Sequence, residues 1–598
     1  MSLSFLDKNK TYEVHIYADA TGTDQTQNPG LVAIIKKIVK APDSILLQLS
    51  AAGVQPFVLR NYNYKINKMK KNCLLLFSLL YLNSVATFGQ NIKVKKTASN
   101  ERIIKVDYNK STGALNTMFK ECVGAGRANE GLRADWQQQL TLAKKDCDFK
   151  YIRMHGLLTD DMAVYTEDNK GNPEYSYQYI DVLYDFLLSI NVKPFVELGF
   201  MPSRLASGDR TIFWWRGNVT PPKDYKKWED LIRNLTQHFT ERYGEEEVKT
   251  WYFEVWNEPN LSPGFWTGTQ ADYLKLYEYT AKAVKSVNPA YKVGGPATAG
   301  AAWVPETIDF CSKNNVPIDF ISTHSYGVGQ GFLDEFGGSG TVLSKEASSV
   351  SGDVINSRKQ ISSSDKPNLE LHYTEWSSSY TPADPFHDSY HSAAYILQKL
   401  KQVGNAANSM SYWVFTDIFE EPGPRFAPFH GGFGLMNTQG IKKAAYFSYD
   451  FLNKLGTTEL QNTDSSSLAT KSKNGNIQVL FWDFTYTLPA RTNNQQYYIK
   501  DLPSKPKASV KVELTGLEKG IYNLEIYKVG YKVNDAYTDY LAMGKPSQLT
   551  RQQVNALKEK NNGDPIATEI VTVGSDGNYS KNFDINENDV FLLNLVKL

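Results

Sequence analysis

Two glutamates lie in sequence settings that suit proton transfer and nucleophilic attack. Glu258 lies in the run WNEPN at residues 256–260, and Glu375 lies in the run HYTEW at residues 372–376. One carboxyl group that protonates a leaving oxygen and a second that attacks the anomeric carbon cleave a glycosidic bond through a covalent intermediate, when they lie about 5 to 5.5 Å apart. We therefore predict that Glu258 is the acid/base and Glu375 the nucleophile of a reaction that retains anomeric configuration.

The residues around the proposed acid support this chemistry. Asn257 carries an amide that can hydrogen-bond the 2-hydroxyl of a sugar, a contact that strengthens in the transition state. Glu258 has to be protonated near neutral pH, so we expect burial and the charge of Glu375 to raise its pKa. Trp376 follows the second glutamate, and its flat apolar face is our candidate for a platform under the sugar ring.

Both glutamates follow strands in a repeated strand and helix pattern. From about residue 100 to 455, short runs rich in β-branched and aromatic residues alternate with longer amphipathic stretches, which is typical of βα units. We predict helices at residues 136–144, 179–189, 224–243, 271–287 and 392–403 from apolar residues spaced three and four apart. We predict strands at residues 121–125, 151–155, 194–198, 251–256, 292–295, 320–324, 369–374 and 411–415.

Eight such units predict a (β/α)8 TIM barrel, whose active site lies where the strands end. Polar side chains gather at these predicted strand ends. They are His155, Glu197, Asn257, Glu258, His324, Tyr326, Glu375, Asp417, Glu420 and Glu421.

The pattern changes after about residue 455. Short alternating strands at residues 477–482, 509–514, 521–527 and 590–595 are separated by turn residues, which predicts a β-sandwich. We therefore expect a catalytic barrel over residues 91–455 and a sandwich over residues 456–598. The sandwich is expected to pack against the barrel, with carbohydrate binding as the alternative role.

Composition excludes some partners. The 65 basic and 64 acidic residues leave a net charge of +1, so no strong field attracts nucleic acid or an anionic membrane. Four scattered cysteines are too few for a disulfide framework or a CxxC zinc site, and we expect them to be buried. His387 and His391 stand four apart, but Asp388 occupies the place of the glutamate in HExxH. We predict no metal and no cofactor.

Residues 69–90 have the parts of a secretory signal peptide. A basic lead is followed by an apolar run at residues 73–82 and a small-residue exit, and this run is too short for the ~20 residues of a membrane span. We expect translation to start at Met69, the protein to be exported, and residues 1–68 to lie outside the functional protein. That upstream segment, with strand-like alternation at residues 12–17 and 44–49, resembles the C-terminal sandwich of family 97 glycosidases.

From residue 100 onward, the chain resembles glycoside hydrolase family 39, the family of β-xylosidases and α-L-iduronidases. The resemblance rests on CVGAGRA at 122–128, LRADW at 132–136, RMHGLL at 153–158, WNEPNL at 256–261, HSY at 324–326 and WVFTDIFEE at 413–421. It implies a barrel glycosidase with Glu258 as acid/base and Glu375 as nucleophile. It also implies a sugar subsite lined by His155, Asn257, His324 and Tyr326 and closed by Phe415, Glu420 and Glu421.

The acidic closure of this subsite bears on the sugar. Glu420 and Glu421 would accept hydrogen bonds from the hydroxyls of a neutral pentose and repel a uronate, which favours a β-xyloside in an oligosaccharide or glycoside. An α-L-iduronidase, an arabinosidase or a β-glucosidase of the same family remains the alternative. So does a barrel that binds sugar without cleaving it, although both carboxylates are present.

Overall fold

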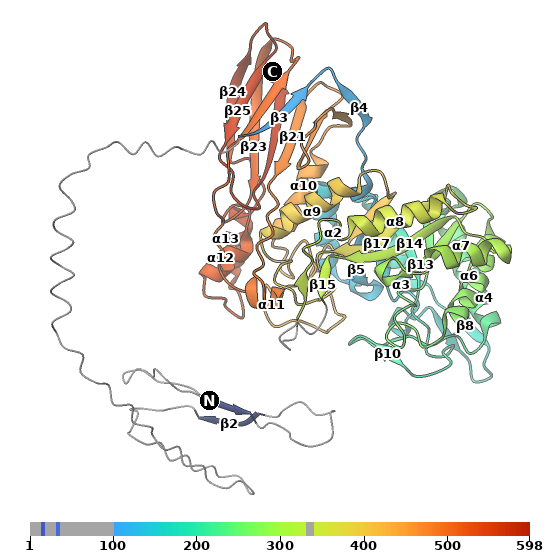
Figure 1. Ribbon diagram of the computed structural model, residues 1–598. Helices are drawn as coiled ribbons and strands as arrows, with labels where there is room; N and C mark the ends of the chain where they lie inside the picture. Colours follow the sequence, from blue (N-terminus) through green and yellow to red (C-terminus); the bar gives the residue numbers. More distant parts are fainter. Residues whose placement is uncertain (1–13, 18–30, 36–100, 331–339) are drawn as a thin grey trace, which may run out of the picture. The chain divides into compact units, whose positions relative to one another are not determined.

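The computed structural model describes residues 14–17, 31–35, 101–330 and 340–598 (Figure 1). Contacts divide the chain into two units, Met1–Lys95 and Lys96–Leu598. In the first unit, β1 (Val14–Tyr17) pairs antiparallel with β2 (Leu31–Ile35), and β1 falls within the strand predicted at residues 12–17. The strand predicted at residues 44–49 and the signal peptide predicted at residues 69–90 lie outside the described residues.

The second unit contains a closed parallel barrel of eight strands, which confirms the predicted fold. Each strand lies within a few residues of its predicted position, because a buried parallel strand is a short, dense apolar run bounded by turn residues. Neighbours in the barrel follow chain order throughout. The strands are β5 (Cys122–Arg127), β6 (Tyr151–His155), β9 (Lys193–Leu198), β12 (Tyr252–Val255), β13 (Lys292–Thr298), β14 (Phe320–Tyr326), β17 (Glu370–Ser377) and β18 (Ser409–Tyr412).

Helices cover the barrel with one apolar face each. On α4 (Tyr225–Tyr243), Trp228, Leu231 and Leu235 are buried, and the side chain of Asp224 caps the helix by accepting from the backbone N–H groups of the first turn. A capping box opens α6 in the same way. The barrel helices are α2 (Ala134–Cys147), α3 (Gln178–Ser189), α4 (Tyr225–Tyr243), α5 (Glu245–Val248), α6 (Gln270–Val287), α7 (Val304–Lys313), α8 (Ser351–Ser362), α9 (His391–Val403) and α10 (Ala444–Asn453).

A seven-stranded sheet and a three-stranded sheet form the predicted sandwich around a separate apolar core. The larger sheet has the order β24-β23-β26-β21-β20-β19-β4, and the smaller has the order β25-β22-β3. Their strands are β3 (Arg102–Asp107), β4 (Ser111–Ala114), β19 (Thr458–Leu460), β20 (Ser467–Lys471), β21 (Ile477–Trp482), β22 (Val510–Thr515), β23 (Gly520–Val529), β24 (Ala567–Val573), β25 (Tyr579–Phe583) and β26 (Val590–Lys597).

The sandwich also takes strands from the start of the second unit, which corrects the predicted boundary. β3 pairs in parallel with β22 and β4 pairs with β19, and Figure 1 shows both in blue among orange and red strands. Arg102, on β3, forms a bidentate ion pair with Asp464 at 2.6 and 2.8 Å. The first strand of the barrel is therefore β5, which begins at Cys122, and the two strands of the second unit described before it belong to the sandwich. Pairing over about 350 to 400 residues leaves no local trace in a sequence.

Three helices in the C-terminal part were not predicted. They are α11 (Asn494–Tyr497), α12 (Ala536–Ala542) and α13 (Arg551–Lys560), and the last two pack together in a small apolar cluster. Across the described ranges, none of the helices has the length and apolar character needed to cross a membrane. The described cysteines, Cys122, Cys147 and Cys311, are unpaired and buried, as predicted.

Candidate active site

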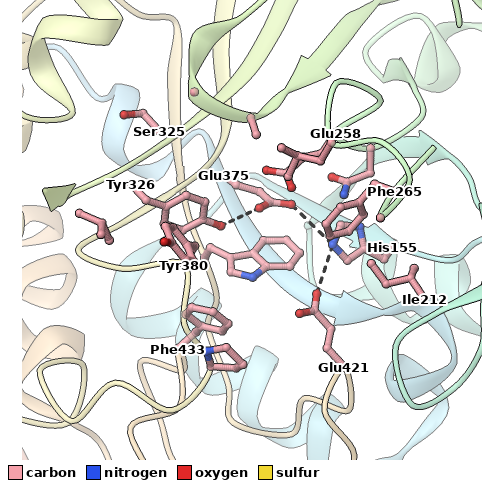
Figure 2. A pocket seen from close by; sticks show the side chains of 18 of the residues that line it. His155, Ile212, Glu258, Phe265, Ser325, Tyr326, Glu375, Tyr380, Glu421 and Phe433 are labelled. Atoms are coloured by element: carbon pink, nitrogen blue, oxygen red, sulfur yellow. Dashed lines mark hydrogen bonds and ion pairs between the residues drawn. The ribbon is translucent and has the colours of Figure 1, made fainter. Parts of the chain in front are cut away.

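A cavity of about 920 Å³ lies where the barrel strands end. Its walls come from the ends of seven barrel strands and the loops that follow them, which is the usual place for a TIM-barrel active site. Figure 2 shows His155, Glu258, Glu375 and Glu421 arranged around one space. The cavity therefore lies at the strand ends, where the sequence predicted the site.

The two glutamates come close together in this cavity. A carboxylate oxygen of Glu258 and one of Glu375 lie within 4.8 Å of each other. Retaining glycosidases place their carboxyl groups about 5 to 5.5 Å apart, whereas inverting enzymes separate them by about 6.5 to 9.5 Å to admit a water. The spacing suits direct attack on the anomeric carbon.

An irregular backbone carries Glu258 into the cavity. Directly after β12, Trp256 and Glu258 have φ angles of 69° and 44°. For residues other than glycine this region costs about 1 to 2 kcal/mol each. The backbone N–H of Glu258 donates to the carbonyl oxygen of Ala297 at 2.8 Å, and the indole of Trp256 donates to the carbonyl oxygen of Phe265 at 2.8 Å. These bonds hold the strained turn in place.

Arg153, on β6, lies at the centre of the buried polar groups. Its guanidinium donates to Glu254 at 2.6 Å, to Glu375 at 2.6 Å and to the amide oxygen of Asn257 at 2.8 Å. Glu197 lies 2.9 Å from the same guanidinium. Burying one cation is costly unless it is paired and fully hydrogen-bonded, and these partners meet that condition. Arg153 therefore orients both the proposed nucleophile and the proposed 2-hydroxyl contact.

Each oxygen of the Glu375 carboxylate has a donor. Arg153 donates to Oε1 at 2.6 Å, and the hydroxyl of Tyr326 donates to Oε2 at 2.6 Å. Glu375 belongs to β17 and Tyr326 ends the neighbouring strand β14. The carboxylate of Glu375 is thus fixed in orientation before a substrate arrives, which favours in-line attack.

Glu258 is in an environment that holds its proton. Burial raises its pKa to about 7, the nearby carboxylate of Glu197 acts in the same direction, and the charges of His155 and Arg153 oppose it. The predicted rise is therefore present, with burial rather than the charge of Glu375 as its main cause. A carboxyl group with a pKa near neutral pH can serve as acid in one step and base in the next.

His324 lies beside both carboxyl groups and is hydrogen-bonded to that of Glu258. Its Nδ1 lies 2.9 Å from Oε1 of Glu258 and 3.5 Å from Oε2 of Glu375, and its Nε2 lies 3.2 Å from the hydroxyl of Thr374. Burial lowers the pKa of His324 to about 4, so the ring is neutral at pH 7. A neutral imidazole beside Glu258 leaves the proton on the carboxyl group.

His155 and Glu421 form a second pair at the cavity wall. Burial alone would lower the pKa of His155, but the charge of Glu197 at 2.7 Å outweighs it and raises the pKa to about 10. Nε2 of His155 lies 3.4 Å from Glu421. Burial raises the pKa of Glu421 to about 7, although His155 opposes the rise. One cationic and one acidic group thus face the cavity together.

Four of the predicted site residues do not line the cavity, and one of these, His324, is fully buried with its Nδ1 2.9 Å from Glu258. Trp376 is fully buried in the main core, with its ring 5.8 Å from that of Tyr412, so it presents no face to a sugar. Phe415 is buried against Trp136 at 5.0 Å. Glu420 turns away to pair with Arg127 at 2.7 Å and with Arg133 at 3.3 Å. The aromatic platform and the paired acidic closure therefore need correction.

Other aromatic residues provide the apolar surface instead. Trp413, at the end of β18, lines the cavity, and its ring lies 4.7 Å from that of His155. The guanidinium of Arg153 lies over the same indole at 5.7 Å. Further aromatic rings in the lining are Phe213, Phe265, Tyr326, Tyr380 and Phe433.

Donor atoms of Glu258, His324 and Glu375 lie within 4.8 Å of one another, a spacing that a metal ion can bridge. Both oxygens of Glu375 already accept from Arg153 and Tyr326, and the positive guanidinium beside them opposes a second cation. The donor set is therefore better suited to proton transfer than to holding a metal.

The chain was also compared with proteins of known family. The family model for glycosyl hydrolases family 39 matches residues 102–579. A β-xylosidase of Caldicellulosiruptor saccharolyticus is 39% identical over 486 residues, covering 81% of this chain and 96% of the relative. A β-xylosidase of Geobacillus stearothermophilus is 44% identical over 372 residues, covering 61% of this chain and 73% of the relative.

A solved structure resembles the fold closely. The crystal structure of a monomeric β-xylosidase from Caulobacter crescentus CB15 is 42% identical, covers 83% of this chain and all of its own, and superposes with a TM-score of 0.80. The family model covers well over half of the chain, and its match includes both glutamates of the cavity. The chain therefore belongs to glycosyl hydrolase family 39 and is a retaining glycosidase.

Proposed function

We propose that the protein is an exo-acting β-xylosidase that releases xylose by double displacement, with Glu375 as nucleophile and Glu258 as acid/base. The observation that carries the mechanism is the pair of buried carboxyl groups, whose closest oxygens lie within 4.8 Å. The pKa of Glu258 near 7 supports its role as the proton donor. The relatives that are 39% and 44% identical are β-xylosidases, which supports the choice of sugar.

In the first step, an oxygen of Glu375 attacks the anomeric carbon while Glu258 gives its proton to the leaving oxygen. The bond to the leaving group breaks, and an ester between the sugar and Glu375 forms. Arg153 and Tyr326 hold the attacking carboxylate in place. The amide of Asn257 is fixed with its oxygen toward Arg153, so its nitrogen is the group available to bind the sugar 2-hydroxyl.

In the second step, Glu258 acts as a base. Having lost its proton, it takes one from a water molecule that attacks the anomeric carbon of the ester. Glu375 leaves as a carboxylate, and xylose is released with its original anomeric configuration. Two inversions at one carbon thus give net retention.

Glu421 is the acidic residue that bears on the choice of sugar. It lines the cavity next to His155, while Glu420 is engaged by arginines outside it. A single carboxyl group suits the hydroxyls of a neutral pentose and disfavours a uronate. Of the two acidic residues predicted to close the subsite, only Glu421 therefore supports a xyloside over an iduronide.

A panel of aryl glycosides tests the proposed function. We expect the purified protein to cleave an aryl β-xyloside faster than the matching α-L-arabinoside, β-glucoside and α-L-iduronide, with Glu375→Ala as the inactive control. Preference for another sugar would leave the carboxylate mechanism intact and refute the xylosidase assignment. Cleavage of none of them would favour a barrel that only binds sugar.

The pH dependence of the reaction should follow the proton on Glu258. Because the acid has to be protonated in the first step and its pKa is about 7, kcat/KM for xylobiose is expected to fall as pH rises through about 7. Glu421 also has a pKa of about 7, so a variant is needed to separate the two. In the Glu258→Ala variant, measured with an activated aryl xyloside, the fall of kcat/KM above pH 7, which is the basic limb of the profile, should disappear. If the fall persists, Glu421 is its source.

We also propose that the protein is exported through a signal peptide that begins at Met69. The order of basic lead, apolar run and small-residue exit supports this proposal, and the family match begins only at residue 102. N-terminal sequencing of the mature protein should find a start just after Gln90. A mature protein that keeps Met1 would contradict it.

A further inference from the structure

A chain of hydrogen bonds runs from the proposed acid into the barrel interior. Glu258 lies 2.9 Å from Nδ1 of His324, whose Nε2 lies 3.2 Å from the hydroxyl of Thr374. That hydroxyl lies 2.7 Å from Oε1 of Glu254. All four side chains are buried, and they come from strands β12, β14 and β17 and from the turn after β12.

Glu254, at the inner end of this series of hydrogen bonds, fixes which atoms donate and which accept. Arg153 lies 2.6 Å from Glu254, and although burial alone would raise the pKa of Glu254, the guanidinium holds it below the usual value. An ionised carboxylate only accepts hydrogen bonds, so the single hydroxyl proton of Thr374 points to Glu254. The oxygen of Thr374 is then an acceptor, and Nε2 of His324 has to carry the proton that it accepts.

The protonation of His324 beside Glu258 follows from that of its other ring nitrogen, beside Thr374. A neutral imidazole carries one proton, so with Nε2 protonated, Nδ1 presents a lone pair to Oε1 of Glu258. Glu375 lies 3.5 Å from Nδ1, beyond ordinary hydrogen-bonding distance, and its oxygens already accept from Arg153 and Tyr326. A lone pair facing a carboxyl group favours the form that has a proton to donate.

We infer that Thr374 is a positioning residue that sets the tautomer of His324 and thereby keeps Glu258 protonated for catalysis. Thr374 does not touch the substrate in this account and acts only through His324. The inference rests on the proposed role of Glu258 as acid/base and adds the group that controls its proton. It also explains why a hydroxyl-bearing residue precedes Glu375 on β17.

Several charged or titratable groups outside this series of hydrogen bonds also face Glu258 and His324. They are Arg153, His155, Glu197, Tyr326, Glu375 and Glu421, and they influence Glu258 or His324 through charge. A change confined to the Thr374 hydroxyl leaves all of them in place. Valine removes that hydroxyl and keeps the branched shape of threonine, so it isolates the effect of the hydrogen bond.

The test is the pH profile of kcat/KM for xylobiose in the full chain carrying Thr374→Val. Without the acceptor at Nε2, the proton of His324 can move to Nδ1 and donate to the carboxylate of Glu258. A hydrogen bond to the ionised form lowers the pKa of an acid. The basic limb should therefore shift to lower pH by about one to two units, the size expected for one hydrogen bond to a charged group.

The matched control is Thr374→Ser, which restores a hydroxyl and should return the limb to its wild-type position. An unshifted limb in Thr374→Val, or an upward shift, would overturn the inference. So would an equal shift in both variants, because the effect would then come from packing.

A second measurement uses the unaltered protein and needs no activity. Long-range ¹⁵N–¹H NMR distinguishes protonated from unprotonated ring nitrogens in the eight histidines, with the His324 signals assigned from their loss in His324→Asn. We expect Nε2 of His324 to be protonated and Nδ1 to be bare. A protonated Nδ1 would overturn the inference even if β-xylosides are cleaved, whereas failure of the proposed function would appear as preference for another sugar or as no cleavage of any glycoside.

Discussion

Glu375→Ala is expected to abolish hydrolysis of every glycoside, whatever its leaving group. Without this carboxylate the ester to the sugar does not form, and the two groups that contact it, the Arg153 guanidinium and the Tyr326 hydroxyl, are donors toward it. Removing the nucleophile from an enzyme that works through a covalent intermediate costs on the order of 10⁴ to 10⁶ in kcat. Initial rates with aryl β-xylosides at high enzyme concentration measure the loss.

The variant should remain folded, so the loss can be assigned to chemistry. Arg153 keeps Glu254 at 2.6 Å and Glu197 at 2.9 Å when Glu375 is removed, and its buried charge stays paired. Glu246→Ala is a matched control, because the side chain of Glu246 is 88% exposed on the surface. A Glu375→Ala protein that retains its thermal unfolding profile and more than a few per cent of its activity would refute Glu375 as nucleophile.

Glu258→Ala is expected to affect substrates in proportion to their need for a proton. For xylobiose, whose leaving group is a poor one, kcat/KM should fall by about 10² to 10⁴ because general acid assistance is lost. For a dinitrophenyl β-xyloside, whose leaving group departs without a proton, formation of the ester should be nearly unaffected. The second step should then become limiting, since the base is missing too.

The contrast between the two substrates is the diagnostic result. We expect a pre-steady-state burst of dinitrophenol from Glu258→Ala, as the ester forms faster than water removes it. Equal losses of kcat/KM for xylobiose and the dinitrophenyl xyloside would contradict the assignment of Glu258 as the acid. Glu246→Ala again reports any effect of changing a glutamate elsewhere.

The barrel and the glutamate pair could be predicted because their signals are local. A strand buried on both faces is a compact apolar run, so β6 of the barrel and β21 of the sandwich were predicted at their observed bounds. Glu258 lies in the turn after β12 and Glu375 lies near the end of β17, so both could be placed once these strands were predicted. By contrast, β3 and β4 join the sandwich through partners hundreds of residues away, which no local pattern encodes.

The error at Trp376 has a simple physical cause. Side chains on a strand alternate between its two faces, so when Glu375 points into the barrel, Trp376 points outward into the layer of helices. The same rule would have identified Arg153, which shares its face of β6 with His155. Glu420 is different, because its pairing with Arg127 depends on tertiary contacts alone.

The most direct test of the account is to trap the sugar on the protein. A 2-fluoro-β-xyloside lacks the 2-hydroxyl contact, which slows both steps, but a dinitrophenyl leaving group keeps the first step fast. The ester to the sugar should therefore form quickly and hydrolyse slowly. Peptide mass spectrometry should then find one fluoroxylosyl group per chain, attached to Glu375, and none in Glu375→Ala. A label on a different residue, or an inverted anomeric configuration in the first product of an ordinary β-xyloside, would contradict the central claim.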